Sequence, residues 1–73
     1  MTRLPIISPK QMARVAERLG FVLDHQRGSH AFYIHPDGRI TTIALHAKDL
    51  PRGTMKKIMR DMGINEEELR KLL

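Results

Sequence analysis

The sequence predicts an α+β fold in which two amphipathic helices cover one face of a three-stranded antiparallel sheet and a short helix ends the chain. Apolar residues recur at helical spacing in two segments, which flank a middle region rich in β-branched and aromatic residues. Two glycine-containing turns divide that middle region into three short strands. Because 73 residues can build only one small core, we expect a single domain over residues 1–73.

The first helix is predicted over about residues 9–19. Ser8 is placed as the N-cap, Pro9 suits the first helical position, and Gln11 can complete a capping box. The apolar positions that follow at i, i+3, i+4 and i+7 form one face: Met12, Val15, Ala16 and Leu19. Gly20 then provides a left-handed stop.

Three strands are predicted next, over residues 21–26, 30–35 and 39 or 40 to 45, with turns at Gly28-Ser29 and Asp37-Gly38. Alternation puts Ala31 and Tyr33 on one face of the middle strand and His30, Phe32 and Ile34 on the other. Both faces carry apolar residues, so the pattern does not say which face the helices cover. If the face with His30 is open, its apolar strip is typical of a binding surface.

The second helix is predicted to open at Pro51 and to end at Gly63. Its apolar face comprises Met55, Ile58, Met59 and Met62, and its outer face carries four cations, Arg52, Lys56, Lys57 and Arg60. Those cations are either an ordinary solvated surface or a surface that attracts nucleic acid. A last short helix is capped by Asn65 with Glu68. This order and size match the double-stranded RNA-binding-domain arrangement.

Composition limits the class of partner. The net charge of +5 and the pI near 10.3 favour acidic partners, with nucleic acid as the first candidate. One Tyr, two Phe and no Trp argue against an extended platform for stacking bases. The absence of cysteine fits a reducing compartment, no apolar run is long enough for a membrane span, and residues 1–7 do not resemble a secretory signal. We therefore expect a cytoplasmic protein without membrane contact.

The turn at residues 26–30 is the candidate site. His30 follows the turn and can exchange a proton near neutral pH. Arg27 supplies a planar fork of donors for a phosphate, Gly28 lets backbone amides approach a ligand, and Ser29 adds a hydroxyl donor. The alternative is a plain hairpin turn with polar residues at its tip.

The four histidines, His25, His30, His35 and His46, do not suggest a metal site. No pair has the i, i+4 helical spacing of zinc ligands, and His30 and His35 point to opposite sides of a regular strand. RNA can be cut without a metal or other cofactor, because its 2′-hydroxyl is an internal nucleophile beside the phosphate. DNA lacks this hydroxyl, so we expect no action on DNA.

These residues together resemble the HicA toxin family. The resemblance rests on Gly20-Phe21, Gln26-Arg27-Gly28-Ser29-His30, His35-Pro36-Asp37-Gly38, His46, Leu50, Gly53-Thr54, Ile58 and Gly63-Ile64. It implies an mRNA interferase with a double-stranded RNA-binding-domain-like fold, a catalytic histidine at His30, and a HicB-type antitoxin that blocks the site. Ala44 departs from the family pattern, where a proline is expected, at the end of the third strand.

Three functions from different classes follow. The first is a metal-independent endoribonuclease in which His30 is the general acid or base. In it, Arg27 and Ser29 hold the phosphate, and Arg52, Lys56, Lys57 and Arg60 attract RNA without reading its sequence. The second is a module that binds RNA without cutting it. The third is a protein-interaction domain that uses Phe32 and Ile34.

Overall fold

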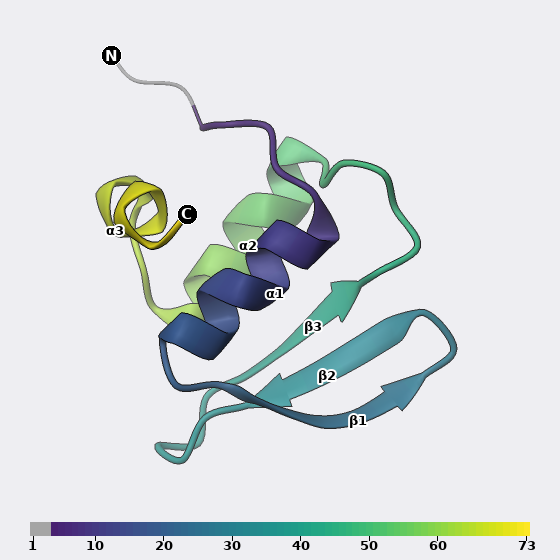
Figure 1. Ribbon diagram of the computed structural model, residues 1–73. Helices are drawn as coiled ribbons and strands as arrows, with labels where there is room; N and C mark the ends of the chain where they lie inside the picture. The colour runs from purple at the N-terminus through teal and green to yellow at the C-terminus, as the bar shows by residue number, and fades with distance from the viewer. Residues whose placement is uncertain (1–3) are drawn as a thin grey trace.

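The computed structural model describes residues 4–73. In chain order the elements are α1 (Pro9–Arg18), β1 (Val22–Arg27), β2 (His30–Ile34), β3 (Ile40–Ala44), α2 (Arg52–Met62) and α3 (Glu66–Leu72). The strands form one antiparallel sheet in the order β1-β2-β3, and α1 and α2 lie side by side on one face of it (Figure 1). The α+β prediction, with its double-stranded RNA-binding-domain-like layers and its short C-terminal helix, is confirmed.

Local signals set most helix ends as predicted, but α2 begins at Arg52 rather than at Pro51, because the backbone of Pro51 is extended (ψ 149°) and Pro51 is the N-cap. Ser8 and Gln11 form the capping box of α1, and Asn65 and Glu68 form that of α3. Such reciprocal bonds satisfy backbone donors that have no partner within the helix. Gly63 ends α2 with φ 73°, in the left-handed region that glycine adopts without steric cost.

Alternate residues of β2 and β3 face the helices and are buried. Ala31 and Tyr33 of β2 are buried, and so are Thr41 and Ile43 of β3. The open face is therefore the face that carries His30. This settles the question that periodicity left undecided.

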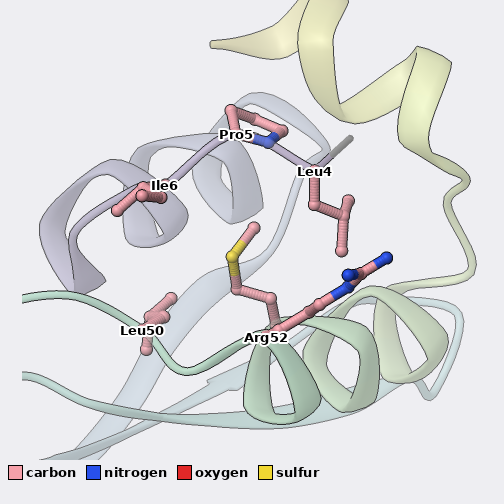
Figure 2. A pocket seen from close by; sticks show the side chains of 6 residues that line it. Leu4, Pro5, Ile6, Leu50 and Arg52 are labelled. Carbon is pink, nitrogen blue, oxygen red and sulfur yellow. The ribbon is translucent and has the colours of Figure 1, made fainter. Parts of the chain in front are cut away.

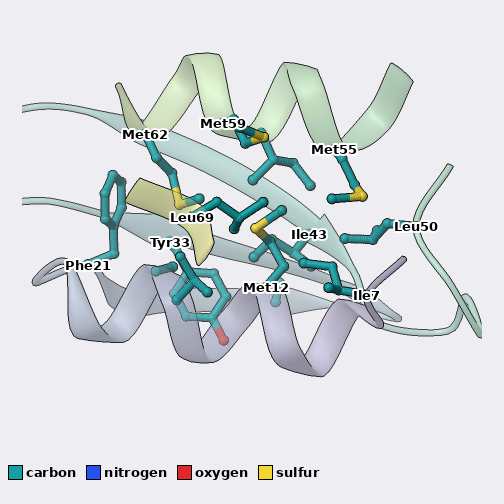
Figure 3. Close-up of a cluster of buried hydrophobic side chains, with 14 residues drawn as sticks. Ile7, Met12, Phe21, Tyr33, Ile43, Leu50, Met55, Met59, Met62 and Leu69 are labelled. Atoms are coloured by element: carbon teal, nitrogen blue, oxygen red, sulfur yellow. The ribbon is translucent and has the colours of Figure 1, made fainter. Parts of the chain in front are cut away.

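The core fills the space between the sheet and the helices (Figure 3). Methionines from both helices meet there: Met12 of α1 is fully buried, as is Met62 of α2. Leu69 of α3 is also fully buried, so the last helix contributes to the same core. Thr41 donates a hydrogen bond to Asp61 Oδ2 (3.1 Å), which ties β3 to α2 beside the apolar contacts.

The strand boundaries differ from the prediction by one residue at several ends. Phe21 was predicted to begin the first strand, yet β1 begins at Val22. The reason is that the Phe21 backbone N–H donates to Ala16 O (2.9 Å) and so completes the C-terminal end of α1. His35 likewise lies beyond β2, where its N–H closes the second turn onto Arg39 O (2.9 Å).

Some of the sequence-based predictions cover residues that the structure does not describe. The N-terminal residues 1–3, which belong to the predicted 1–73 domain and to the segment judged unlike a secretory signal, are outside the described residues. Within residues 4–73, no helix is both long and apolar enough to cross a membrane.

Candidate functional site

The hairpin turn between β1 and β2 has the backbone that its sequence predicts. Arg27 and His30 are paired across it, with Gly28 and Ser29 as the two central residues. Gly28 has φ 60°, whereas Ser29 does not have a positive φ. A positive φ at the first central residue only is the signature of a type II′ turn, which suits the twist of a hairpin. A Cβ at Gly28 would meet nothing within 4 Å, so the turn is open to an approaching ligand.

Arg27 and His30 project from the same face of the sheet, because directly opposed residues of an antiparallel pair share a face. Both are exposed. A β-bulge at Asp24 lies between the paired positions Leu23 and His25. The extra residue shifts the alternation, so that Val22 and Arg27, which are an odd number of residues apart, both face outward. The open face thus combines a cation and an imidazole at one end with apolar residues at the other.

The apolar end of this face is a row across all three strands. Val22 pairs with Ile34, and Ile34 pairs with Ile40. Val22 is 56 % exposed and Ile40 is 61 % exposed. Phe32 follows in the next outward position of β2, where His25 stacks on it at 4.3 Å between ring centroids. The predicted apolar strip is therefore present, and it is wider than Phe32 and Ile34 alone.

A second histidine lies at the turn. His46 follows β3, and its Nδ1 is 2.8 Å from the Ser29 hydroxyl oxygen. The centroids of the His30 and His46 rings are 6.0 Å apart. Leu45 N donates to Ser29 O (2.7 Å), which holds the segment after β3 against the turn. Two exposed imidazoles, a hydroxyl and a guanidinium therefore gather at one corner of the sheet.

The other two histidines have contacts of a different kind. His35 Nε2 donates to Leu19 O (3.1 Å) at the end of α1, while its Nδ1 accepts from Asp37 N (3.1 Å). The ring also meets Phe21 edge-on, with centroids 5.1 Å apart. Hydrogen bonding from the Arg39 backbone, together with its guanidinium, lowers the pKa of Asp37 in the same turn. This cluster joins the second hairpin to α1 and is structural. His25, besides stacking on Phe32, lies 2.7 Å from the exposed Asp24 carboxylate.

The four cations of α2 lie apart from the turn. Arg52, Lys56, Lys57 and Arg60 are exposed on α2, which packs on the face of the sheet opposite to His30. Lys57 pairs with Asp61 (3.1 Å). Arg52 borders a hollow of about 230 Å³ between α2 and the segment before α1, together with Leu4, Pro5, Ile6, Leu50 and Met55 (Figure 2). None of the residues that line this hollow belongs to the hairpin turn.

The side chains present do not assemble a metal-binding set: within residues 4–73, no group of three or more His, Asp or Glu residues is placed to hold an ion. The imidazoles and the guanidinium at the turn are groups of the kind that transfer protons and bind phosphate. The contact of His46 with Ser29 could not be predicted from neighbouring residues in the sequence. His46 is far from Ser29 along the chain, and only the pairing of β2 with β3, which sets His30 opposite Ala44, brings it near.

Comparison with known families identifies a match over most of the chain. The family model described as the HicA toxin of bacterial toxin–antitoxin systems matches residues 9–64. These residues supply α1, the whole sheet and α2, and they include the turn with His30 as well as His46. No curated protein matches the chain.

Proposed function

Because the chain belongs to the HicA toxin family of bacterial toxin–antitoxin systems, we propose that it is an endoribonuclease that cleaves mRNA without a metal ion or other cofactor. One observation supports this activity above the others. His30 is exposed at a hairpin turn and shares the open face of the sheet with Arg27. A proton-transfer group beside a fixed cation is what cleavage at a ribose-linked phosphate needs.

In this proposal His30 is the general acid or the general base. The 2′-hydroxyl of the RNA attacks the adjacent phosphorus, so one proton must leave that hydroxyl and another must reach the departing oxygen. Arg27 would hold the phosphate through its guanidinium fork. Gly28 and Ser29 would let the phosphate come close to the turn, since a Cβ at Gly28 would meet nothing within 4 Å. DNA would not be cut, because it lacks the nucleophile.

The basic helix would attract RNA at longer range. Arg52, Lys56, Lys57 and Arg60 lie on α2, in the layer opposite to the open face. They are therefore proposed to raise the local concentration of RNA without touching the scissile phosphate. Replacing two of them with alanine should weaken RNA binding at low salt and reduce its salt dependence, while the cleavage rate of bound RNA stays unchanged.

The partner of the proposed toxin is a HicB-type antitoxin. The open face offers it an apolar row, Val22, Ile34 and Ile40, at the opposite end from the polar corner with His30. A protein that covers the open face from this row to the corner would bury His30 and so exclude RNA. We place both proteins in the cytoplasm, where mRNA is available and where a chain without cysteine needs no oxidising environment.

The test of the catalytic role is His30→Ala in the purified protein. The variant should lose RNA cleavage in the presence of EDTA while it keeps its melting temperature, because His30 is exposed and its removal leaves no cavity. Retained cleavage in the folded variant would exclude His30 as the catalytic residue.

A second candidate is an RNA-binding module that does not cleave. The observation that favours it is the separation of the cations on α2 from His30, since a basic helix can bind RNA without any chemistry at the turn. Incubating RNA with the wild-type protein, with and without chelator, distinguishes the two. Intact RNA in both samples supports the module, and cleavage that survives chelation supports the nuclease.

A further inference from the structure

The four histidines of the chain fall into two groups by their contacts. His35 is engaged through both ring nitrogens inside the fold, and His25 stacks on Phe32 and pairs with Asp24. His30 and His46 are both exposed, and their ring centroids are 6.0 Å apart. Rings at this separation can contact one phosphodiester group from two sides through hydrogen bonds of about 2.8 Å each.

The position of His46 is fixed by the turn that presents His30. The Ser29 hydroxyl contacts His46 Nδ1 at 2.8 Å, and Leu45 N donates to Ser29 O at 2.7 Å. One residue therefore anchors the segment through its carbonyl and the ring through its hydroxyl. Because Nδ1 is occupied by Ser29, the other ring nitrogen, Nε2, is the one available for a substrate.

Ser29 suits a ring that changes its protonation state. A hydroxyl group both donates and accepts. It can donate to Nδ1 of a neutral imidazole that carries its proton on Nε2. It can also accept from Nδ1–H, either in the other neutral tautomer or in the imidazolium. When Nδ1–H donates to the hydroxyl, Nε2 of the neutral ring is free to accept a proton, and the same hydrogen bond persists in the imidazolium.

We propose that His46 is the second proton-transfer residue of the site and that Ser29 is its positioning residue, an inference that rests on the proposed ribonuclease function. In the reaction, one neutral imidazole of the pair takes the proton of the 2′-hydroxyl as the O2′–P bond forms. The other, as imidazolium, gives its proton to the 5′-oxygen as the P–O5′ bond breaks. The products are a 2′,3′-cyclic phosphate and a 5′-hydroxyl, and exchange with water restores the two protonation states.

The experiment measures kcat against pH in EDTA for the wild type and for His46→Ala, on a synthetic RNA of mixed sequence. The wild type should give a bell-shaped profile, because one histidine must be neutral and the other charged. His46→Ala should lower kcat by about 10²–10⁴-fold and remove one limb of the bell, and His30→Ala should remove the opposite limb. His25→Ala, which removes an exposed imidazole from the same face, is the matched control and should keep the wild-type profile.

Ser29 is tested by a pair of variants. Ser29→Ala should lower kcat with little change in KM, and Ser29→Thr, which keeps the hydroxyl, should restore most of it. A purely structural role of Ser29 would change the melting temperature without changing the pH profile. His46→Gln serves as a second variant if His46→Ala does not fold.

The possible results distinguish a failure of the role of His46 from a failure of the ribonuclease function. If His30→Ala abolishes cleavage while both His46 variants keep the wild-type kcat and both limbs of the bell, the role of His46 is refuted and the nuclease function stands. If the wild-type protein leaves RNA intact, both proposals are refuted together.

Discussion

Replacing His35 with alanine should destabilise the protein without touching its chemistry. His35 donates to Leu19 O (3.1 Å), accepts from Asp37 N (3.1 Å) and meets the Phe21 ring edge-on at 5.1 Å. Its side chain is 19 % exposed, unlike that of the exposed His30. It therefore connects the end of α1 to the second hairpin from a largely buried position.

The loss in the free energy of unfolding of His35→Ala can be estimated from the contacts that are removed. The hydrogen bond to the part-buried Leu19 carbonyl contributes about 1 kcal/mol. The aromatic contact with Phe21 contributes about another 1 kcal/mol. The bond from Asp37 N is exposed, and water replaces it. A loss of about 2 kcal/mol in the free energy of unfolding lowers the melting temperature of a domain of this size by about 8–16 °C.

Thermal unfolding followed by circular dichroism measures this shift, with His25→Ala as the control. His25 pairs with an exposed carboxylate and stacks on an exposed face, so its removal should cost less than about 1 kcal/mol. RNA cleavage by folded His35→Ala, assayed well below its melting temperature, should equal that of the wild type. Equal melting temperatures for the two variants would refute the structural role assigned to His35.

Three further predictions concern the fold. Gly20 and Gly38 have nearly the same φ, 100° and 101°, but a Cβ at Gly20 would lie 3.1 Å from His35 Nε2, whereas one at Gly38 would meet nothing within 4 Å. Gly20→Ala should therefore lower the free energy of unfolding more than Gly38→Ala in urea titrations, and equal losses would contradict the close contact with His35. Ser8→Ala removes the N-cap of α1 and should cost about 1 kcal/mol in the same assay, with no loss expected if the capping box is unimportant. Burial raises the pKa of Tyr33 above its ordinary value of 10.0, so its contribution to stability is full below pH 10 and is lost as the pH rises through the folded-state pKa. Tyr33→Phe should remove this alkaline loss in unfolding measured against pH, and a tyrosinate absorbance that titrates in the folded protein at the ordinary value would refute it.

The sequence predicts those parts of the fold that depend on neighbouring residues. Capping boxes form between residues three apart, so Ser8 with Gln11 and Asn65 with Glu68 are visible in the sequence. The boundaries of β1 and the bulge at Asp24 were not predicted. Both depend on where the backbone finds its partners: Phe21 N bonds to α1, and Asp24 has no residue opposite it in β2.

The candidate site was likewise predictable only where it depends on neighbouring residues. Arg27, Gly28, Ser29 and His30 are consecutive, and a two-residue turn between two apolar runs is enough to predict that they lie together. Whether the helices cover the face with His30 or leave it open could not be predicted, because Ala31 and Tyr33 are apolar on one side and Phe32 and Ile34 on the other. The contact of His46 with Ser29 depends on the register of β3 and on the path of the segment after it, which a single sequence does not encode in any local pattern.

The most direct measurement of the central claim compares wild-type protein and His30→Ala on one RNA and on its 2′-deoxy counterpart, in EDTA and under single-turnover conditions. The wild type should cut the RNA and leave the deoxy strand intact, and folded His30→Ala should cut neither. Cleavage of the deoxy strand, or unchanged cleavage of the RNA by His30→Ala, would contradict a mechanism in which this imidazole moves a proton for an attacking 2′-hydroxyl.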